Sequence, residues 1–493
     1  STTGTASFTP TDDNIFEADE TAIISISSVS GADATESGTQ SETITISADG
    51  DAAPSVTLTT SATSIDENAG TSLTLTATLS NPTNADVTVS LSTGGTGTEG
   101  TDYSTISDIT ISAGSTTGTA SFTPTDDSVY EGNETGIVSI SGVSGGSATE
   151  SGTQSVTITI NENESAPTVT LTTSATSIDE NSGSVLTLTA TLSNATTADV
   201  TVSIATSGTA TEGTDYTDGS GNIDDIVISA GNTTETISFK PTDDSVYEGD
   251  ETATISISGV SGGSATESGT QAVSITISEN ESAPTVTLAV SATSIAENSG
   301  STLTLTATSS VVADEDITVS ISTSGTATEG TDYGTISDIT ISAGATTGTA
   351  TFDPTDDSIS DVAETAAVAI SGVSGADATE SGTQSVTITI NDNESTPTIT
   401  LAVSATSIAE NAGSSLTLTA TSSIASGSDI TVSLGTGSTA TEGTDYGTVS
   451  DITISAGATT GTTTFTPTDD SMYETSTNET AIISIDGVSG GSA

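Results

Sequence analysis

The sequence predicts an all-β chain made of tandem antiparallel β-sandwiches, and three observations lead to this class. Apolar residues alternate with Ser or Thr over short runs, as in Val156-Thr157-Ile158-Thr159-Ile160, which is the pattern of a half-buried strand. Clusters of Gly, Asn, Asp and Ser separate these runs, and no segment has helical spacing. The same series of runs then recurs along the chain.

One repeat contains seven alternating runs, and each is expected to be a strand. In chain order they are Val56–Leu58, Leu73–Ala77, Val87–Leu91, Ile109–Ile111, Ala120–Phe122, Ile137–Ile140 and Val156–Ile160. Seven strands in about 110 residues, each with one apolar face, predict a sandwich of the immunoglobulin type. Aromatic residues make up only 3% of the chain. We therefore expect a lean core of Val, Ile and Leu with Phe122 and Tyr130.

The repeat has the length of an independent domain. The segment from Thr101 to Ser128 recurs from Thr331 to Ser358 and, less closely, twice more. Its Asp-Asp pair returns after 117, 113 and 113 residues, at positions 126, 243, 356 and 469. A solenoid repeat is 20–50 residues long, so these units are domains with their own cores. The predicted modules are 1–53 (partial), 54–166, 167–283, 284–396 and 397–493, the last without its final strand.

The ends of the chain fall inside a repeat. Residue 1 is equivalent to Ser115 and residue 493 to Ala148. We expect these residues to be part of a much longer repetitive protein. The alternative is that subunits exchange strands.

Charge and composition restrict the partners. The chain has 66 acidic residues, one basic residue, Lys240, and no histidine, which gives a formal net charge of −65. Such a charge excludes nucleic acid and anionic membranes as electrostatic partners. Cysteine is absent, so no disulfide holds a module together. The longest apolar stretches have the length of a strand, so we expect no membrane insertion in this segment. An array this acidic must be screened by salt or bind cations.

Acidic residues of the second module gather where strands end. They are Glu67, Asp102, Asp126, Asp127, Glu131, Glu134 and Glu162. Alternate strand ends of a sandwich meet at one pole, so these carboxylates are expected to converge. Hard oxygen ligands without His or Cys are those that Ca²⁺ prefers, whereas Mg²⁺ accepts few protein carboxylates. The sequence therefore predicts calcium sites.

Two alternatives compete with a metal site. Acidic loops of halophilic or marine proteins are commonly solvated surface, and this reading is favoured for Glu99 and Glu150. Paired carboxylates also serve in glycosidases. That reading fits poorly, because the chain has no aromatic sugar platform and the pairs recur in every module. No candidate nucleophile, base or cofactor motif points to an enzyme.

Four ordered motifs resemble the Calx-beta family. They are Glu67-Asn68-Ala69-Gly70, Gly100-Thr101-Asp102-Tyr103, the Asp126 to Glu134 segment, and Asn161-Glu162-Asn163. The resemblance covers essentially the whole chain and implies immunoglobulin-like sandwiches with Ca²⁺ clustered at one pole, beside the link to the next domain. It also implies equivalent ligands in the other modules. These are Asp12, Asp13, Glu17 and Glu20 in the first; Glu180, Asp215, Asp243, Asp244, Glu248, Glu251 and Glu279 in the third; Glu297, Asp332, Asp356, Asp357, Asp361, Glu364 and Asp392 in the fourth; and Glu410, Asp445, Asp469, Asp470, Glu474 and Glu479 in the fifth.

The closing acidic motif departs from the family pattern. The strongest calcium-sensing members end with three aspartates, but here the motif is N-E-N, S-E-N or N-D-N. Fewer charges predict weaker binding, in the millimolar range that suits seawater or extracellular fluid. Two residues are also inserted before Glu479.

These observations predict a structural role outside the cell. The expected function is a calcium-stabilised repeat region of a long bacterial adhesin or cell-surface filament, in a marine or saline setting, that acts as an extended semi-rigid rod. Each module is expected to span about 40 Å. The alternative is a module that binds a glycan or another partner, or packs laterally on copies of itself through its Ser and Thr faces.

Overall fold

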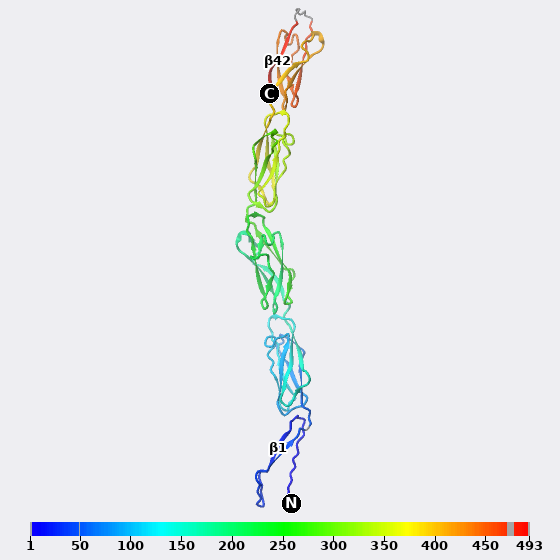
Figure 1. Ribbon diagram of the computed structural model, residues 1–493, viewed down its shortest axis with the longest axis vertical. Coiled ribbons are helices and arrows are strands. Elements are labelled where there is room, and N and C mark those ends of the chain that lie inside the picture. The colour runs from blue at the N-terminus through cyan, green and yellow to red at the C-terminus, as the bar shows by residue number, and fades with distance from the viewer. Residues whose placement is uncertain (1, 49, 471–477, 492–493) are drawn as a thin grey trace. The chain divides into compact units, whose positions relative to one another are not determined.

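The computed structural model describes residues 2–48, 50–470 and 478–491. Every module is all-β, which confirms the predicted fold class, and Figure 1 shows the long strands of each module running along that module's length. The only helical elements among the described residues are single 3₁₀ turns: η1 (Glu180–Ser182), η2 (Glu297–Ser299) and η3 (Glu410–Ala412). Each turn begins at the glutamate of an E-N-x-G motif.

The second module is a sandwich of two sheets, with strand orders β4-β12-β10-β6-β7 and β11-β3-β5-β8. Its strands are β3 (Ser55–Thr60), β4 (Ser64–Asp66), β5 (Leu73–Leu79), β6 (Val87–Gly95), β7 (Ile109–Ile111), β8 (Thr117–Phe122), β10 (Glu134–Ser144), β11 (Thr149–Glu150) and β12 (Ser155–Asn161). The seven expected runs all form strands. The long strands pair antiparallel, and the short β4 and β11 pair parallel with β12 and β3.

The third and fourth modules repeat this arrangement. The third contains β13 (Thr168–Thr173), β14 (Ser177–Asp179), β15 (Leu186–Leu192), β17 (Val200–Gly208), β18 (Tyr216–Thr217), β19 (Ile226–Ile228), β20 (Thr234–Pro241), β22 (Glu251–Ser261), β23 (Thr266–Glu267) and β24 (Ala272–Ser278). The fourth contains β25 (Thr285–Val290), β26 (Ser294–Ala296), β27 (Leu303–Ser309), β29 (Ile317–Gly325), β30 (Ile339–Ile341), β31 (Thr347–Phe352), β33 (Glu364–Ser374), β34 (Thr379–Glu380) and β35 (Ser385–Asn391).

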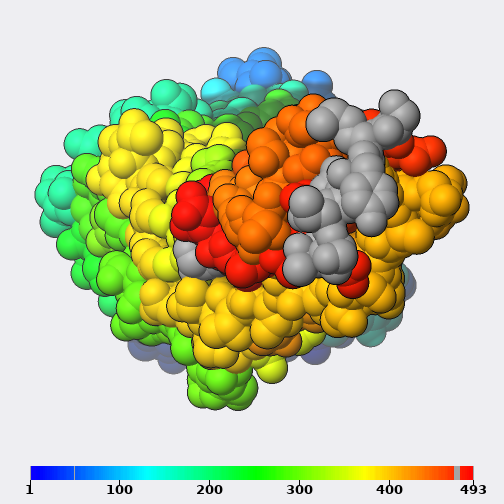
Figure 2. Space-filling model, turned by 90° about the horizontal axis from the view of Figure 1, so that it is seen from above, coloured from blue at the N-terminus to red at the C-terminus, as the bar shows by residue number. Residues whose placement is uncertain are grey.

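The two partial modules hold fewer strands. The first has β1 (Glu20–Ser25) paired with β2 (Ser41–Ile46). The fifth has β36 (Ile399–Val403), β37 (Leu416–Ser422), β39 (Ile430–Ser438), β40 (Ile452–Ile454), β41 (Thr460–Phe465) and β42 (Ala481–Gly490). In Figure 2, which looks onto this module, the red surface of the C-terminal residues lies against the orange surface of the residues before them.

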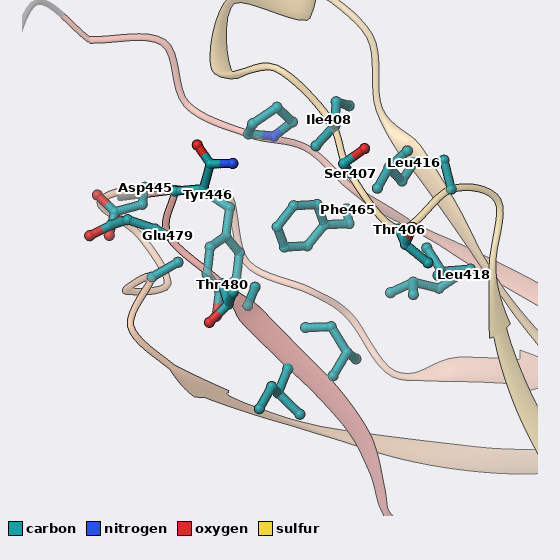
Figure 3. A pocket seen from close by; sticks show the side chains of 18 of the residues that line it. Thr406, Ser407, Ile408, Leu416, Leu418, Asp445, Tyr446, Phe465, Glu479 and Thr480 are labelled. Atoms are coloured by element: carbon teal, nitrogen blue, oxygen red, sulfur yellow. The ribbon is translucent and has the colours of Figure 1, made fainter. Parts of the chain in front are cut away.

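The edge of β42 that corresponds to the β12 side of β10 has no strand partner among the described residues. A hollow of about 1300 Å³ opens there, lined by core residues such as Leu416, Leu418 and Phe465, and Figure 3 shows them around it.

An aromatic pair forms the centre of each core. In the second module Tyr103 and Phe122 are stacked with ring centroids 4.6 Å apart, and both are almost fully buried. The pair recurs as Tyr216–Phe239, Tyr333–Phe352 and Tyr446–Phe465, each at 4.7 Å. The expectation that Tyr130 joins Phe122 in the core is therefore wrong. Tyr130 is only half-buried, in β9 (Val129–Tyr130), and that strand pairs with the next module.

Short parallel pairs join one module to the next. β9 pairs with β16 (Ala195–Thr196), β21 (Val246–Tyr247) with β28 (Val312–Ala313), and β32 (Ile359–Ser360) with β38 (Ala425–Ser426). A bridge between Phe16 and Thr83 occupies the same place at the start of the chain. The first strand of each pair begins two residues after an Asp-Asp motif, so this motif lies beside a joint.

Candidate metal centre

The glutamate of the E-N-x-G motif fixes the Asp-Asp segment. Glu67 follows β4 and is 7% exposed. Its Oε1 accepts a hydrogen bond from the backbone N–H of Asp127 at 3.3 Å, and its own N–H donates to the carbonyl of Asn161 at 3.0 Å. The equivalent carboxylate accepts from Asp244 in the third module and from Asp470 in the fifth, at 3.0 and 3.1 Å. One buried glutamate therefore brings three segments of the sequence to the same pole.

The acid that closes each sandwich is held by backbone donors. Glu162 Oε2 accepts from the N–H groups of Glu131 and Gly132 at 2.6 and 2.9 Å, and its Oε1 accepts from those of Asn163 and Glu164 at 2.9 Å each. Burial disfavours its charge, but these donors together lower the pKa of Glu162 below its ordinary value. Glu162 is therefore a fixed, ionised carboxylate in the linker.

Carboxylate oxygens of the second module form three overlapping groups. Within each group the oxygens lie within 4.8 Å of one another. The groups are Glu67 with Glu162 and Glu164, Glu67 with Asp127 and Glu131, and Asp102 with Glu131 and Glu134. Because Glu67 and Glu131 belong to two groups each, the pole carries a continuous row of carboxylates rather than scattered charges.

Burial and mutual repulsion raise the pKa values of this row. Burial, followed by charges such as that of Glu162, raises the pKa of Glu67 to about 7, although the Asp127 N–H opposes the shift. Burial and the neighbouring Asp102 raise the pKa of Glu134 to about 7 and also raise that of Glu131. Ionising these groups together at neutral pH is therefore unfavourable, and a bound cation would offset this cost.

The third module repeats the geometry of the second. Carboxylate oxygens of Glu180, Glu279 and Glu281 lie within 4.8 Å of one another. Glu279 accepts hydrogen bonds from the N–H groups of Glu248 and Gly249. Burial raises the pKa of Glu180. The Asp215 carboxylate accepts from the N–H of Thr211 at 2.6 Å, and Glu251 begins β22.

The fourth module has the same constellation with shorter side chains. Asp361 and Asp392 stand where the second module has Glu131 and Glu162. Burial, with Glu394 next, raises the pKa of Glu297 to about 8. Burial, with Asp332 next, raises the pKa of Glu364 to about 7. Burial also raises the pKa values of Asp361 and Asp392. The Asp357 carboxylate accepts from the N–H of Ile359 at 2.7 Å.

The partial modules hold only part of the row. In the fifth module, Figure 3 shows the carboxylates of Asp445 and Glu479 next to each other. The equivalent residues of the second module, Asp102 and Glu134, share one carboxylate group. Glu474 lies outside the described residues. The residues of the first module begin after the positions that correspond to Glu67 and Asp102. Of its predicted acids Asp12, Asp13, Glu17 and Glu20, Asp13 accepts from the N–H of Ile15 at 2.9 Å.

The first aspartate of each pair lies at the margin of the row. Asp126 is exposed. Glu162 is the main cause of the raised pKa of Glu164, and the charge of Asp126 adds to that shift. The equivalent residues Asp243, Asp356 and Asp469 are exposed as well. The named carboxylate groups instead contain the second aspartate, Asp127.

Glu99 and Glu150 serve the fold and are not merely solvated. Glu99 accepts from the Thr93 hydroxyl at 2.7 Å and from the Ile106 N–H at 2.6 Å. Glu150 accepts from the N–H of Gln154 at 2.5 Å. Both tie a loop, and neither is a member of the carboxylate groups named above.

A second linker glutamate extends the site, and sequence reasoning missed it. Glu164, Glu281 and Glu394 follow the closing acid by two positions in three linkers. The first two join Glu67–Glu162 and Glu180–Glu279 within 4.8 Å. Glu164 thus adds a carboxylate beside the closing motif N-E-N, which itself carries fewer charges than three aspartates. The recurrence of glutamate at this position was the available signal.

The row offers oxygens that suit a hard cation. Among the described residues, five buried carboxylate oxygens in these linkers and motifs have no hydrogen-bond partner: Oε2 of Glu164, Glu281 and Glu394, Oε1 of Glu297 and Oδ1 of Asp392. Buried, unpartnered carboxylate oxygens are costly unless a cation binds them. An all-oxygen set of several carboxylates matches Ca²⁺ better than Mg²⁺. The residues therefore fit a calcium ion.

No helix of the described residues is long and apolar enough to cross a membrane.

Comparison with solved structures finds two kinds of similar protein. The calcium binding domain CBD12 of CALX1.1 is 18% identical, with 40% of this chain and 77% of that chain covered and a TM-score of 0.19. Invasin, a bacterial integrin-binding protein, is 14% identical, with 82% and 74% covered and a TM-score of 0.22. The Yersinia pseudotuberculosis adhesin InvE is 15% identical, with 46% and 59% covered and a TM-score of 0.23.

Comparison with family models finds matches over most of the chain. No curated protein matches the chain. Residues 53–163 match the LapA domain. Residues 162–281, 279–394 and 392–491 each match the Calx-beta domain, which together is more than half of the sequence. The chain therefore belongs to the Calx-beta family and carries its domains in tandem.

Proposed function

We propose that this chain is a calcium-stabilised repeat region of a long extracellular adhesin or cell-surface filament, in which the modules act as a semi-rigid stalk. The observation that carries the proposal is the convergence of carboxylates, around the buried Glu67, at the pole that also makes the joint. Glu131 directly follows Tyr130, the residue that pairs with Thr196 of the next module. An ion at this pole would hold the joint as well as the loops.

Calcium would act by ordering groups that otherwise repel one another. The residues that would hold it in the second module are Glu67, Asp102, Asp127, Glu131, Glu134, Glu162 and Glu164, with Asp126 adding charge nearby. The ion supplies positive charge and oxygen coordination, and it binds the folded chain in preference to the unfolded one. Equivalent residues would do the same at the other joints. With boundaries at Pro167, Pro284 and Pro397, as predicted, each such pole would lie just before a joint.

The composition and charge of the chain fit an exposed, saline location. A single basic residue and a formal charge of −65 suit a polypeptide in a saline medium outside the cell, where millimolar calcium is present. We assign no catalytic role to any residue.

The test compares the full chain in calcium and in EGTA. Chelation should lower the melting temperature and shorten or soften the particle seen by small-angle scattering. Mg²⁺ at the same concentration should restore little of either property. Unchanged melting and scattering on chelation would contradict the proposal.

A second candidate is lateral packing on copies of the chain. The outer face of the β11-β3-β5-β8 sheet carries hydroxyl side chains in register, with Thr57 opposite Thr78 and Thr78 opposite Thr117. The next row is Thr59, Thr76 and Thr119, and both rows lack charge. Electron microscopy of native material would separate single stalks from ordered bundles.

A further inference from the structure

The joints of the array differ in the residues that form them. The residue that ends the parallel pair is Tyr130, Tyr247 or Ser360, with Phe16 in the same place at the start of the chain. The surface that receives it in the next module also varies. This variation stands out, because the Asp-Asp pair and the E-N-x-G motif on either side of it recur in the second to fifth modules.

The third module reaches into the fourth through Tyr247. This side chain is 9% exposed and packs in the core cluster of the fourth module, which includes Ala313 and Ala376. Its hydroxyl donates to Asp377 Oδ2 at 3.0 Å, and its carbonyl accepts from the N–H of Asp314 at 3.2 Å. Tyr247 therefore belongs to the third module by sequence and to the fourth by packing.

The receiving surface of the fourth module is adapted to this tyrosine. In the second and third modules a threonine and a glycine face each other, as Thr83 with Gly146 and Thr196 with Gly263. A Cβ added to either glycine would lie 2.6 Å from the threonine methyl. The fourth module has Ala313 and Ala376 instead, followed by Asp377 where the others have Ser147 and Ser264. The smaller Ala313 admits a side chain at residue 376, and Asp377 supplies the acceptor for the tyrosine hydroxyl.

The joint between the fourth and fifth modules is formed by different residues. Ser360 and Ser426 are both 2% exposed. The N–H of Gly427 donates to the Ser360 carbonyl at 3.3 Å and also to the Asp361 carboxylate. A Cβ at residue 427 would overlap that carboxylate. The other joints have Asn84, Thr197 or Asp314 at this position and a glutamate in place of Asp361.

We propose that these receiving surfaces are specific docking sites for the end of the preceding module: Ala313, Ala376 and Asp377 accept a tyrosine, whereas Ser426 and Gly427 accept Ser360 with Asp361. The end of each module therefore fits the receiving surface of the module that follows it, and modules cannot exchange places along the chain without loss of these contacts. Such matching opposes wrong pairing between domains of nearly identical sequence. It depends on packing and backbone bonds, and it holds with or without calcium.

Reciprocal substitutions in the full chain test the proposal. Hydrogen–deuterium exchange would be measured by mass spectrometry in calcium and in EGTA, over residues 312–316, 375–379 and 425–429. Tyr247→Ser should speed exchange at least tenfold over the first two segments and leave the third unchanged. Ser360→Tyr should speed exchange over the third, because Ser360 and Ser426 are both buried and a ring at residue 360 would displace their contact. Tyr247→Phe removes only the hydroxyl and should have a smaller effect in the same direction as Tyr247→Ser.

The alternative is that any aromatic residue strengthens any joint. It predicts that Ser360→Tyr slows exchange over residues 425–429, and that result would overturn the proposal. Unchanged exchange over residues 312–316 in both Tyr247 variants would overturn it as well. If Tyr247→Ser unfolds the fourth module, the Tyr247→Phe variant still decides whether the contact with Asp377 stabilises this joint.

Discussion

The Glu67 carboxylate accepts a hydrogen bond from the backbone N–H of Asp127, 60 residues away in the sequence. The same pair recurs as Glu180–Asp244 and Glu410–Asp470. This contact joins the start of a module to the segment that forms the joint. It also buries a carboxylate whose pKa rises to about 7. We infer that the contact is built for a cation, since an isolated acid at this place would be costly to ionise.

Replacing Glu67 by Gln should separate the fold from the metal site. Glutamine retains an oxygen that accepts from Asp127 but removes a charge from the crowded row. The melting temperature of the second module should therefore stay the same or rise in EGTA, and its increase on adding calcium should shrink. Differential scanning calorimetry of the full chain in both conditions measures this.

Glu99→Gln is the matched control for that variant. Its carboxylate holds Thr93 and Ile106 and is not part of the carboxylate groups. It should lower the melting temperature by a similar amount in calcium and in EGTA. A Glu67→Gln variant that behaved in the same way would show that Glu67 is only structural.

Replacing Glu164 by Gln should weaken calcium binding at one joint. Its Oε2 is buried without a hydrogen-bond partner beside Glu67 and Glu162. Loss of one charged ligand should lower the affinity of that site about tenfold, comparable to the loss of a supporting group in other metal sites. Calorimetric titration of the variant measures the change. Glu150→Gln, which alters a loop acid outside these groups, should leave the affinity unchanged.

Stability without calcium should fall as the pH rises through neutrality. The pKa values of Glu67 and Glu134 rise to about 7 from an ordinary 4.5, mainly through burial. The folded chain then binds more protons than the unfolded chain between these values. The stability that these groups contribute is thus fully present below about pH 4.5 and is lost as the pH rises through about 7. Melting temperatures in EGTA from pH 5 to pH 8 should decline.

Calcium should reverse this dependence, because the ligands must lose their protons to bind the ion. In saturating calcium the melting temperature should hold or rise from pH 5 to pH 8, and mixing with calcium at pH 7 should release protons. A decline of equal size with and without calcium would mean that the raised pKa groups and the ion site are separate.

The two aromatic residues expected in the second core should respond differently to truncation. Phe122 is fully buried against Tyr103, so Phe122→Ala should cost about 3–5 kcal/mol of the second module's unfolding free energy. Tyr130 pairs with Thr196, so Tyr130→Ala should act on the joint and leave the second core intact. Denaturant unfolding combined with local hydrogen exchange distinguishes the two. Equal destabilisation of the second core by both variants would contradict the packing described.

Strand alternation was enough to predict the sandwich, because side chains on a half-buried strand alternate between core and solvent. Val156 to Ile160 and its counterparts show this pattern without interruption. The convergence of Glu67, Asp127 and Glu162 also followed from their positions at strand ends. The joint could not be predicted in this way. Val129 and Tyr130 form a strand of two residues, too short to show alternation, and their partner lies in another module.

Glu164 was missed for a related reason. A glutamate in a polar linker looks like solvated charge until the chain folds back over Glu162. Asp126 and Asp127 are both exposed, yet only the second belongs to the named carboxylate groups. In both cases the local sequence gives the residue type, but the backbone path decides which carboxylate enters the row.

Calcium titration of the full chain by isothermal calorimetry at pH 7 measures whether the carboxylate row binds the ion. We expect saturable binding at several sites per chain with affinities near the millimolar range, about that of extracellular modules, and weaker binding of Mg²⁺. Simultaneous replacement of Glu67, Glu180, Glu297 and Glu410 by Gln should remove most of the binding. Absence of saturable binding up to about 10 mM calcium, well above that range, would contradict the account.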